Sequence, residues 1–360
     1  MRSEGPSSRV SNVPQFVVVG LQSTGKSSVL QRISCIRLPR DAELCTRVPV
    51  ELRIRRSDST ELKVKVGETD FVSTDSEAVE KAIRNLQDRL RGDKEISDQS
   101  VVVEIESKAH PNVTLIDLPG YFFPLHASNL EETARQKLVA SLINSRISQN
   151  SALILHATPL NQDAATINTW AIVNAADPQK KRTLTVLTKA DEVETQDVFL
   201  RRLQHITKDD KPGTRYFIVD GRVEKDENQT LANMRGWLSG SPLAHRVNVG
   251  LRALEEDLQN ALLDHTLLCL PTLKASLLLE RSACRERLGE IGEEPPRPNE
   301  ALTGGLAAFP PKLEALFVAH SRAIVKEIEQ MDTHKDCQGH SVSVCWTARA
   351  GWTTKSGSQR

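Results

Sequence analysis

The sequence predicts an α/β protein with a mainly parallel sheet flanked by helices, followed by a partial α-helical segment. Two observations support this prediction. Short apolar runs alternate with segments of helical apolar spacing as far as about residue 240, and only helical spacing continues beyond it. In sheets of this kind the ligand lies beyond the carboxyl ends of the strands, so we expect the functional residues there.

Each expected strand is a short apolar run that ends near a turn or a polar residue. The strands are expected at 15–20, 50–55, 61–66, 101–106, 112–117, 151–157, 183–188 and 215–219. The helices between them are expected at 26–34, 76–92, 130–147, 163–176, 195–204 and 228–238. Together these elements define a domain over residues 14–240, after a polar lead-in, 1–13, that we expect to be disordered.

The rest of the chain divides into a helical part and a tail. Residues 241–331 carry apolar stripes that predict helices at 244–266, 272–290 and 312–330, with a proline-rich break at 292–300. Residues 332–360 have no periodicity and are expected to be disordered. The helical part is therefore a partial bundle whose stripes must be buried against other surfaces.

The composition is typical of a soluble globular protein. Lys and Arg together number 47, and so do Asp and Glu, which makes the formal net charge zero. This balance argues against binding nucleic acid or an anionic membrane through bulk charge. No apolar run approaches the ~20 residues of a membrane span, and the polar N-terminus lacks the core of a signal peptide. A cytoplasmic location is therefore expected.

The six cysteines are scattered, so a disulfide framework is not expected in a chain of this length. One group has residue types and spacing that suit zinc, namely His334, Cys337, His340 and Cys345. This segment lacks the strand and helix signals of a zinc finger. A polar tail that happens to carry these residues is the favoured interpretation.

The strongest motif joins the first expected strand to the first expected helix. Residues 20–27, GLQSTGKS, fit G-x-x-x-x-G-K-[ST] in the strand–turn–helix context that the pattern requires. The glycines let the backbone curl around phosphate oxygens, where amides and the helix N-terminus attract negative charge. Lys26 would neutralise the β- and γ-phosphates, and Ser27 would ligate Mg²⁺. The loop residues expected to bind nucleotide are Gly20, Gln22, Ser23, Thr24, Gly25, Lys26, Ser27 and Ser28.

Two further features fit the surroundings of a nucleotide phosphate. The strand at 112–117 ends in Asp-Leu-Pro-Gly, where Asp117 can hold Mg²⁺ through water and the Gly120 amide can reach a γ-phosphate. Thr46 lies in the loop before the next strand, where a threonine can supply a second Mg²⁺ ligand. A plain turn hydroxyl is the alternative at Thr46.

The strand at 183–188 ends in the sequence Thr188-Lys189-Ala190-Asp191. The Asp191 carboxylate can accept hydrogen bonds from the N1–H and N2–H₂ groups of guanine, which adenine does not offer, so such a site rejects adenine. The Lys189 stem can pack against the base. In isolation this segment could be an exposed charged turn. As the third element in this order, it predicts GTP rather than ATP.

Hydrolysis of GTP requires a water held in line with the γ-phosphate. Many GTPases place a Gln directly after the Asp-x-x-Gly motif, but this chain has Tyr121 there. A phenol is a poor substitute for that amide, so another group must orient the water or hydrolysis is slow. Gln22, inside the phosphate loop, is the candidate.

The chain resembles a dynamin-superfamily GTPase of the dynamin/Mx type over about residues 14–330. The resemblance rests on GLQSTGKSS (20–28), LPR…TRVP (38–49), DLPG (117–120), TKAD (188–191) and the longer run ADPQKKRTLTVLTKAD (176–191). The Gln-Ser pair in the phosphate loop, combined with Thr-Arg-x-Pro, is more specific than the loop alone. This resemblance implies a P-loop GTPase domain followed by part of a helical stalk.

The resemblance also implies roles for single residues. Gln22 would orient the attacking water, and Ser23 would help bind a charge-compensating monovalent cation, K⁺ or Na⁺. Thr46 would be the switch threonine, and with Lys26 these residues form the expected catalytic set. Asp220 would take the last base-and-ribose position, which is usually Asn in the family.

The same resemblance implies partners. They are GTP and GDP with Mg²⁺, a second copy bound through the GTPase domain, and membrane or microtubule surfaces, without nucleic acid. Three hypotheses stay open: an assembling GTPase, a GTP-dependent binding scaffold that hydrolyses slowly, and a remnant that binds nucleotide without assembling. Turnover that rises with protein concentration would separate the first from the other two.

Three departures from the family pattern stand out. Asp41-Ala42-Glu43 replaces the glycines that precede the family's switch threonine. A bundle helix is expected before the first strand, but only the short segment 1–13 precedes it. The stalk is expected to continue past residue 331, where residues 332–360 resemble no part of the family. A truncated or mis-spliced gene product would have this form.

Overall fold

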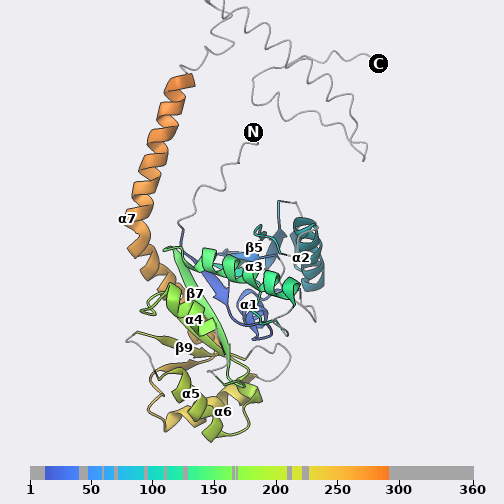
Figure 1. Cartoon of the computed structure of the whole chain (residues 1–360), viewed down its shortest axis with the longest axis vertical. Helices are drawn as coiled ribbons and strands as arrows, with labels where there is room; N and C mark the ends of the chain where they lie inside the picture. Colours follow the sequence, from blue (N-terminus) through green and yellow to red (C-terminus); the bar gives the residue numbers. More distant parts are fainter. Residues whose placement is uncertain are drawn as a thin grey trace, which may run out of the picture. The chain divides into compact units, whose positions relative to one another are not determined.

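The computed structural model describes residues 13–39, 48–58, 61–68, 72–92, 96–108, 112–124, 129–163, 167, 169–208, 213–220 and 227–291. Within these residues, ten strands form one sheet in the order β10-β9-β8-β7-β1-β6-β2-β5-β3-β4. The sheet is mostly parallel and flanked by helices, which confirms the predicted fold class (Figure 1).

The sheet has a parallel part and a part of mixed direction. The parallel part comprises β1 (Gln15–Val19), β6 (Val113–Asp117), β7 (Ala152–Pro159), β8 (Thr183–Thr188), β9 (Arg215–Ile218) and β10 (Val247–Val249). The mixed part comprises β2 (Val50–Arg56), β3 (Lys63–Val66), β4 (Val72–Ser73) and β5 (Val101–Ser107). Strand β2 pairs antiparallel with β6 and parallel with β5, and β3 pairs antiparallel with β4 and β5.

The helices connect these strands, and several begin at a side-chain cap. They are α1 (Lys26–Ser34), α2 (Ser76–Arg91), α3 (Leu130–Ile147), α4 (Thr169–Ala176), α5 (Gln196–Ile206), α6 (Glu227–Ser239) and α7 (Leu251–Ile291), with a short 3₁₀ helix at Ala190–Glu192. The side chains of Asp75, Asn129 and Thr195 accept hydrogen bonds from first-turn amides of α2, α3 and α5. Such caps satisfy amides that a helix start leaves without intrahelical partners.

Strand β1 is apolar from Phe16 to Val19 because both of its faces are buried there. Phe16 and Val18 point into a core that also contains residues of α1, α2 and α7. Val17 and Val19 point into a second core that contains residues of α3 and α4. The loops at the carboxyl end of β1 are therefore supported by packed helices on both sides of the sheet.

The predicted helices after residue 241 are wrong in two respects. One helix, α7, runs from Leu251 to Ile291 through Pro271, where we expected a break between 266 and 272. Proline in a helix interior removes one hydrogen-bond donor and crowds the carbonyl four residues earlier, which favours a break, but its fixed φ angle is compatible with a helix. Val247, which lies within the helix that we expected at 244–266, belongs to β10 and pairs with Tyr216. The chain changes direction at Gly250, whose φ is 117°, and α7 begins at the next residue.

Helix α7 buries one stripe, Leu254, Leu258, Ala261 and His265, in the first part of its length. Further along, leucines such as Leu267 and Leu268 are exposed, at 60% and 75%. By length and composition, Leu251–Arg287 could cross a membrane, although we found no apolar run of that length in the sequence. One helix of this kind is weak evidence for a membrane span, so we infer none from it.

The chain divides into two compact units, Met1–Leu279 and Glu280–Arg360, and the division lies within α7. The boundary that we predicted at 240/241 stays a prediction. Several predicted features lie outside the described residues: the lead-in 1–12, the helix at 312–330, the tail 332–360 and the cysteine–histidine group His334, Cys337, His340 and Cys345. Strand β4, which we did not predict, has only two residues.

Candidate functional site

The phosphate loop follows β1 and enters α1, as the sequence predicts. Ser23 and Gly25 have positive φ angles, 60° and 86°, so the chain makes the tight curl that such a loop needs. A Cβ atom on Gly20 would lie 2.5 Å from the Ala157 carbonyl oxygen, so only glycine fits there. Lys26 is 6% exposed, and its Nζ donates to the Leu21 carbonyl at 2.8 Å. The lysine therefore already lies within the curl of the loop.

The two predicted Mg²⁺ ligands meet at the start of α1. The Ser27 hydroxyl donates to Oδ2 of Asp117 at 3.0 Å, and Asp117, the last residue of β6, is 2% exposed. A hydroxyl and a carboxylate oxygen are hard oxygen donors of the kind that Mg²⁺ prefers. The donor set therefore fits a magnesium ion held by Ser27, with Asp117 behind it.

Gly120 lies directly against the phosphate loop. A Cβ atom on Gly120 would be 2.7 Å from the Gln22 Cα atom and 2.8 Å from the Lys26 Nζ atom. The next residue pairs with the loop: Tyr121 N donates to the Gly20 carbonyl at 3.0 Å, and Gln22 N donates to the Tyr121 carbonyl at 2.8 Å. Gln22, Lys26 and Gly120 thus surround one small region, where a terminal phosphate of a nucleotide in this loop would lie.

The predicted base-binding segment follows β8 and forms the short 3₁₀ helix. Lys189 has a φ of 56°, a conformation that a residue with a side chain seldom adopts, and its Nζ lies 3.9 Å from Oε1 of Glu192. Such strained positions often occur at ligand sites. Asp191 lies within this 3₁₀ helix and is half-buried.

Thr188 has a contact that the sequence does not reveal. We expected it to belong to the base-binding segment, and its hydroxyl donates to the Thr24 carbonyl of the phosphate loop at 2.6 Å. Thr188 therefore joins the base-binding segment to the phosphate loop. The two predicted parts of the site are hydrogen-bonded to one another.

Asp220 lies at the next strand end. It is 2% exposed and follows β9, whose neighbour Val219 donates its amide to the Leu187 carbonyl of β8 at 3.1 Å. This pairing brings Asp220 to the same edge of the sheet as Thr188–Asp191. The structure therefore gives the four segments at the ends of β1, β6, β8 and β9 a common edge.

The remaining predicted site residues are Thr46, Ser23, Ser28 and Thr24, together with Asp41 and Glu43 of the same loop as Thr46. Thr46, Asp41 and Glu43 lie outside the described residues. Ser23 is exposed at the tip of the phosphate loop, and Ser28 lies in the first turn of α1, half-buried. Thr24 is 1% exposed and donates its hydroxyl to the Leu21 carbonyl at 2.8 Å, so it stabilises the curl of the loop.

Sequence reasoning missed Gln136 of α3. Its Nε2 donates to the Tyr121 hydroxyl at 3.0 Å. From the sequence, Tyr121 was notable only because it occupies the position of a glutamine in many other GTPases. The sequence holds no signal for their contact, because Gln136 looks like any polar residue on the outer side of a helix.

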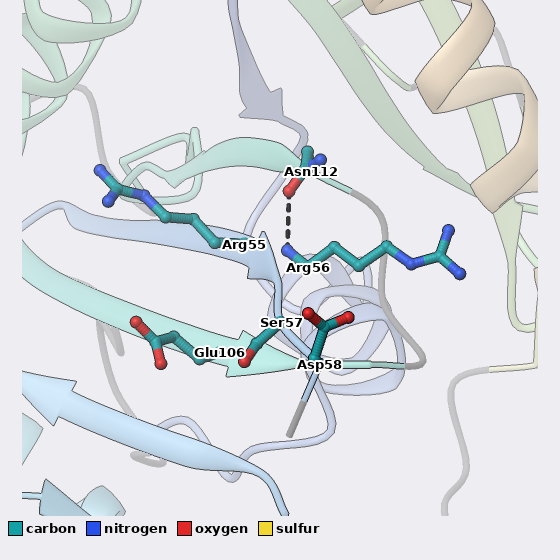
Figure 2. Close-up of a pocket in the computed structure, with 6 residues that line it drawn as sticks. All are labelled: Arg55, Arg56, Ser57, Asp58, Glu106 and Asn112. Atoms are coloured by element: carbon teal, nitrogen blue, oxygen red, sulfur yellow. Dashed lines mark hydrogen bonds between the residues drawn. The ribbon is translucent and has the colours of Figure 1, made fainter. Parts of the chain in front are cut away.

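A polar pocket lies at the opposite end of β6. It is lined by Arg55, Arg56, Ser57, Asp58, Glu106 and Asn112, and Asn112 precedes the strand that Asp117 ends. In Figure 2 the two arginine side chains point away from one another, and the Arg56 amide donates to Asn112 Oδ1 at 2.7 Å. Asn112 and Asp117 are five residue steps apart along the chain, at about 3.3 Å for each step of a strand. The pocket is therefore no part of the nucleotide site.

The fold and these strand-end segments define a class of protein, the P-loop nucleotide-binding domains of the GTPase type. Comparison with known families agrees, since residues 16–190 match the model of the dynamin family. Among individual proteins, the chain is 31% identical over 302 residues to interferon-induced GTP-binding protein MxE of Danio rerio. It is 31% identical over 304 residues to Mx1 of Oncorhynchus mykiss and 29% over 308 residues to Mx2 of Mus musculus.

The chain belongs to the dynamin superfamily of large GTPases and carries that family's GTP-binding domain. The alignment with MxE covers 79% of this chain and 48% of that protein, and the alignment with mouse Mx2 covers 81% and 46%. The chain thus spans about half the length of the curated relatives that it matches. A domain of this type requires Mg²⁺ in general.

Proposed function

We propose that this protein binds GTP with Mg²⁺ and hydrolyses it to GDP and phosphate by a dynamin-type route. The observation that carries the proposal is the meeting of Gly120, Gln22 and Lys26 at one point of the phosphate loop. The three relatives named above are all described as GTP-binding proteins, which supports the choice of nucleotide.

The chain's own residues divide the work as follows. Lys26 and the loop amides bind the phosphates, and Ser27 holds Mg²⁺, with Asp117 bonded to its hydroxyl. The Gly120 amide binds the γ-phosphate, and the Gln22 side chain orients a water for in-line attack. Asp191 selects guanine, with Asp220 at the neighbouring strand end.

Replacement of Gln22 by alanine tests the hydrolytic role. We expect kcat for GTP to fall by about 10²-fold, because an oriented polar group is lost in the transition state. The Kd for GTP should stay within a few fold, since the loop amides and Lys26 remain. Lys81→Ala, an exposed site on α2, is the control and should change neither quantity. An unchanged kcat in Gln22→Ala would remove Gln22 from the mechanism.

We further propose that two copies associate through the GTPase domain, and that Ser23 helps to bind K⁺ or Na⁺ beside the phosphates. Ser23 is exposed at the loop tip, where a second copy could cover it. GTP turnover per molecule, measured across protein concentration in K⁺, Na⁺ and a large organic cation, tests both proposals. Constant turnover would exclude stimulation by association, and equal rates in all three salts would exclude the cation.

A GTP-dependent binding scaffold is the second candidate. It is favoured by Tyr121, which stands where many GTPases carry the glutamine that orients the water. A scaffold of this kind would bind GTP, hydrolyse it slowly and show turnover that does not depend on protein concentration. The same concentration series therefore separates the two candidates.

A further inference from the structure

Tyr121 is fastened on two sides. Its backbone pairs with the phosphate loop through two hydrogen bonds, at 3.0 Å to the Gly20 carbonyl and at 2.8 Å from the Gln22 amide. Its hydroxyl accepts a hydrogen bond from Gln136 Nε2 at 3.0 Å, and its ring meets Phe123 edge to face at 5.3 Å. The residue therefore connects the phosphate loop to helix α3.

Helix α3 is fixed against the sheet by buried apolar side chains. Val139, Ile143 and Ile147 are completely buried in the core beneath the helix, together with Val17 and Val19 of β1. Tyr121 and Phe122 pack against the same core. Because α3 is packed against β1, the hydrogen bond from Gln136 fixes the Tyr121 hydroxyl relative to the strand that precedes the phosphate loop.

Tyr121 contacts the two residues, Gly120 and Gln22, to which the proposed function gives the γ-phosphate and the attacking water. Gly120 precedes it and is packed against the Gln22 backbone. The Gln22 amide is bonded to the Tyr121 carbonyl. A shift of Tyr121 would move both the amide proposed to bind the γ-phosphate and the backbone of the residue proposed to orient the water. A misplacement of reacting groups by about 1 Å can cost about 10²-fold in rate.

We propose that Tyr121 and Gln136 are positioning residues for GTP hydrolysis, which set the places of Gly120 and Gln22 through the hydroxyl–amide hydrogen bond. This inference rests on the proposed hydrolytic function. In this role the two side chains act through the Tyr121 backbone, which is hydrogen-bonded to Gly20 and Gln22. The phenol that replaces the usual glutamine thus acts on residues of the phosphate loop.

The test uses variants that remove or keep this one hydrogen bond. Tyr121→Phe removes only the hydroxyl, and Gln136→Met keeps the side-chain length without the amide. Gln136→Glu keeps the hydrogen bond with its direction reversed, because the tyrosine hydroxyl can donate to a carboxylate. Lys137→Ala, the exposed neighbour on α3, is the control.

We expect kcat for GTP to fall about 3- to 10-fold in Tyr121→Phe and in Gln136→Met, the usual range for one lost hydrogen bond. The double variant should be no slower than either single variant, because both changes break the same bond. Gln136→Glu should recover most of the rate. The Kd values for GTP and GDP should stay within about twofold in every variant, since the loop that binds the other phosphates is intact.

Unchanged kcat in Tyr121→Phe, or effects that multiply in the double variant, would overturn the proposal. A parallel loss of GDP affinity and thermal stability would also overturn it, because a purely structural role predicts that pattern. If the unaltered protein binds GTP but does not hydrolyse it, the proposed function itself fails and the positioning role falls with it. If the unaltered protein hydrolyses GTP normally, but the variants do not show a lower kcat with an unchanged Kd, the positioning role alone is rejected.

Discussion

The phosphate end of the site and its base end are built in different ways. At the phosphate end Thr24, Lys26 and Asp117 are 1%, 6% and 2% exposed, and backbone hydrogen bonds hold the loop to Tyr121. At the base end the Lys189 side chain is 31% exposed and its ion-pair partner Glu192 is 49% exposed. Buried side chains and backbone hydrogen bonds therefore dominate the phosphate end, whereas the base end combines the surface pair Lys189–Glu192 with the buried Asp220, which is 2% exposed.

The difference predicts what substitutions should do. A change at the phosphate end disturbs packed atoms and should remove binding or chemistry for every nucleotide. A change at the base end should leave the phosphate loop in place and alter which nucleotide is preferred. The predictions that follow test this contrast, beginning with the largest expected effect.

Lys26→Ala removes the cation of the phosphate loop. We expect GTP binding or turnover to fall by more than about 10²-fold, because charge-assisted hydrogen bonds to phosphate are strong. ATP and GDP binding should fall as well, since all three nucleotides share the phosphates. Calorimetric titration and phosphate release measure these effects, with Lys81→Ala as control. A Lys26→Ala variant that turns over GTP at the normal rate would place the site elsewhere.

Gly120→Ala tests how tightly the phosphate end is packed. The added Cβ atom would lie 2.7 Å from the Gln22 Cα atom, so the loop must shift. We expect kcat to fall by about 10- to 100-fold, and GDP affinity to change less, because GDP lacks the γ-phosphate that the Gly120 amide would bind. Gly236→Ala is the matched control, since nothing lies within 4 Å of its added Cβ atom. Equal effects of the two variants would contradict the packed arrangement.

Asp191→Asn tests the base end. The carboxamide no longer accepts both guanine hydrogen bonds, so we expect GTP affinity to fall by about 10- to 100-fold, the range for hydrogen bonds to a charged group. Xanthosine triphosphate should bind better than GTP, because its edge matches the inverted pattern of donors and acceptors. Asp197→Asn, an exposed change in the first turn of α5, should leave the preference unchanged. A uniform loss for all nucleotides would mean that the two ends are not separable.

Much of the phosphate end could be predicted from the sequence because its geometry is local. Residues 20–27 form one strand–turn–helix unit, and the pattern of glycines, lysine and serine describes its backbone directly. The fold class followed from the alternation of apolar runs and helical spacing. These signals depend on neighbours in the chain, which a sequence displays.

The missing parts depend on contacts between distant segments. The Tyr121–Gln136 hydrogen bond and the Thr188–Thr24 hydrogen bond join residues 15 and 164 positions apart, so no local pattern announces them. Strand β10 has three residues and exists because Val247 pairs with Tyr216. The continuity of α7 through Pro271 was hidden because proline is also a common helix terminator.

The smallest predicted effect concerns β7, which lies between the two ends of the site. His156 pairs with Val19 of β1 on one side and with Thr185 of β8 on the other. It is completely buried, its Nε2 lies 2.9 Å from the Thr169 hydroxyl, and its ring meets Trp170 edge to face. The His156 ring is therefore part of the buried packing around β7, between the strands that carry the two ends of the site.

Burial, and to a smaller extent the charge of Lys180, lower the pKa of His156 from 6.5 to about 3. Between these two pH values the unfolded chain binds a proton that the folded chain does not bind. The stability contributed by the neutral ring is therefore fully present above pH 6.5 and decreases as the pH falls towards 3. The decrease cannot exceed about 1.4 kcal/mol per pH unit for one proton.

His156→Gln should remove this part of the pH dependence while keeping a polar group near Thr169. We expect the free energy of unfolding of the unaltered protein to fall more steeply between pH 7 and pH 5 than that of the variant, by up to about 1 kcal/mol per unit. Urea titrations at several pH values measure the two slopes, and the slope is the readout even if the variant is less stable at every pH. His205→Asn is the control, because the His205 side chain is half-exposed, with its Nδ1 atom 3.3 Å from Asp163 Oδ1, and its ring is not buried. Equal slopes for His156→Gln and the unaltered protein would mean that His156 becomes protonated without unfolding. The buried packing around β7, between the two ends of the site, would then be able to contain a charge.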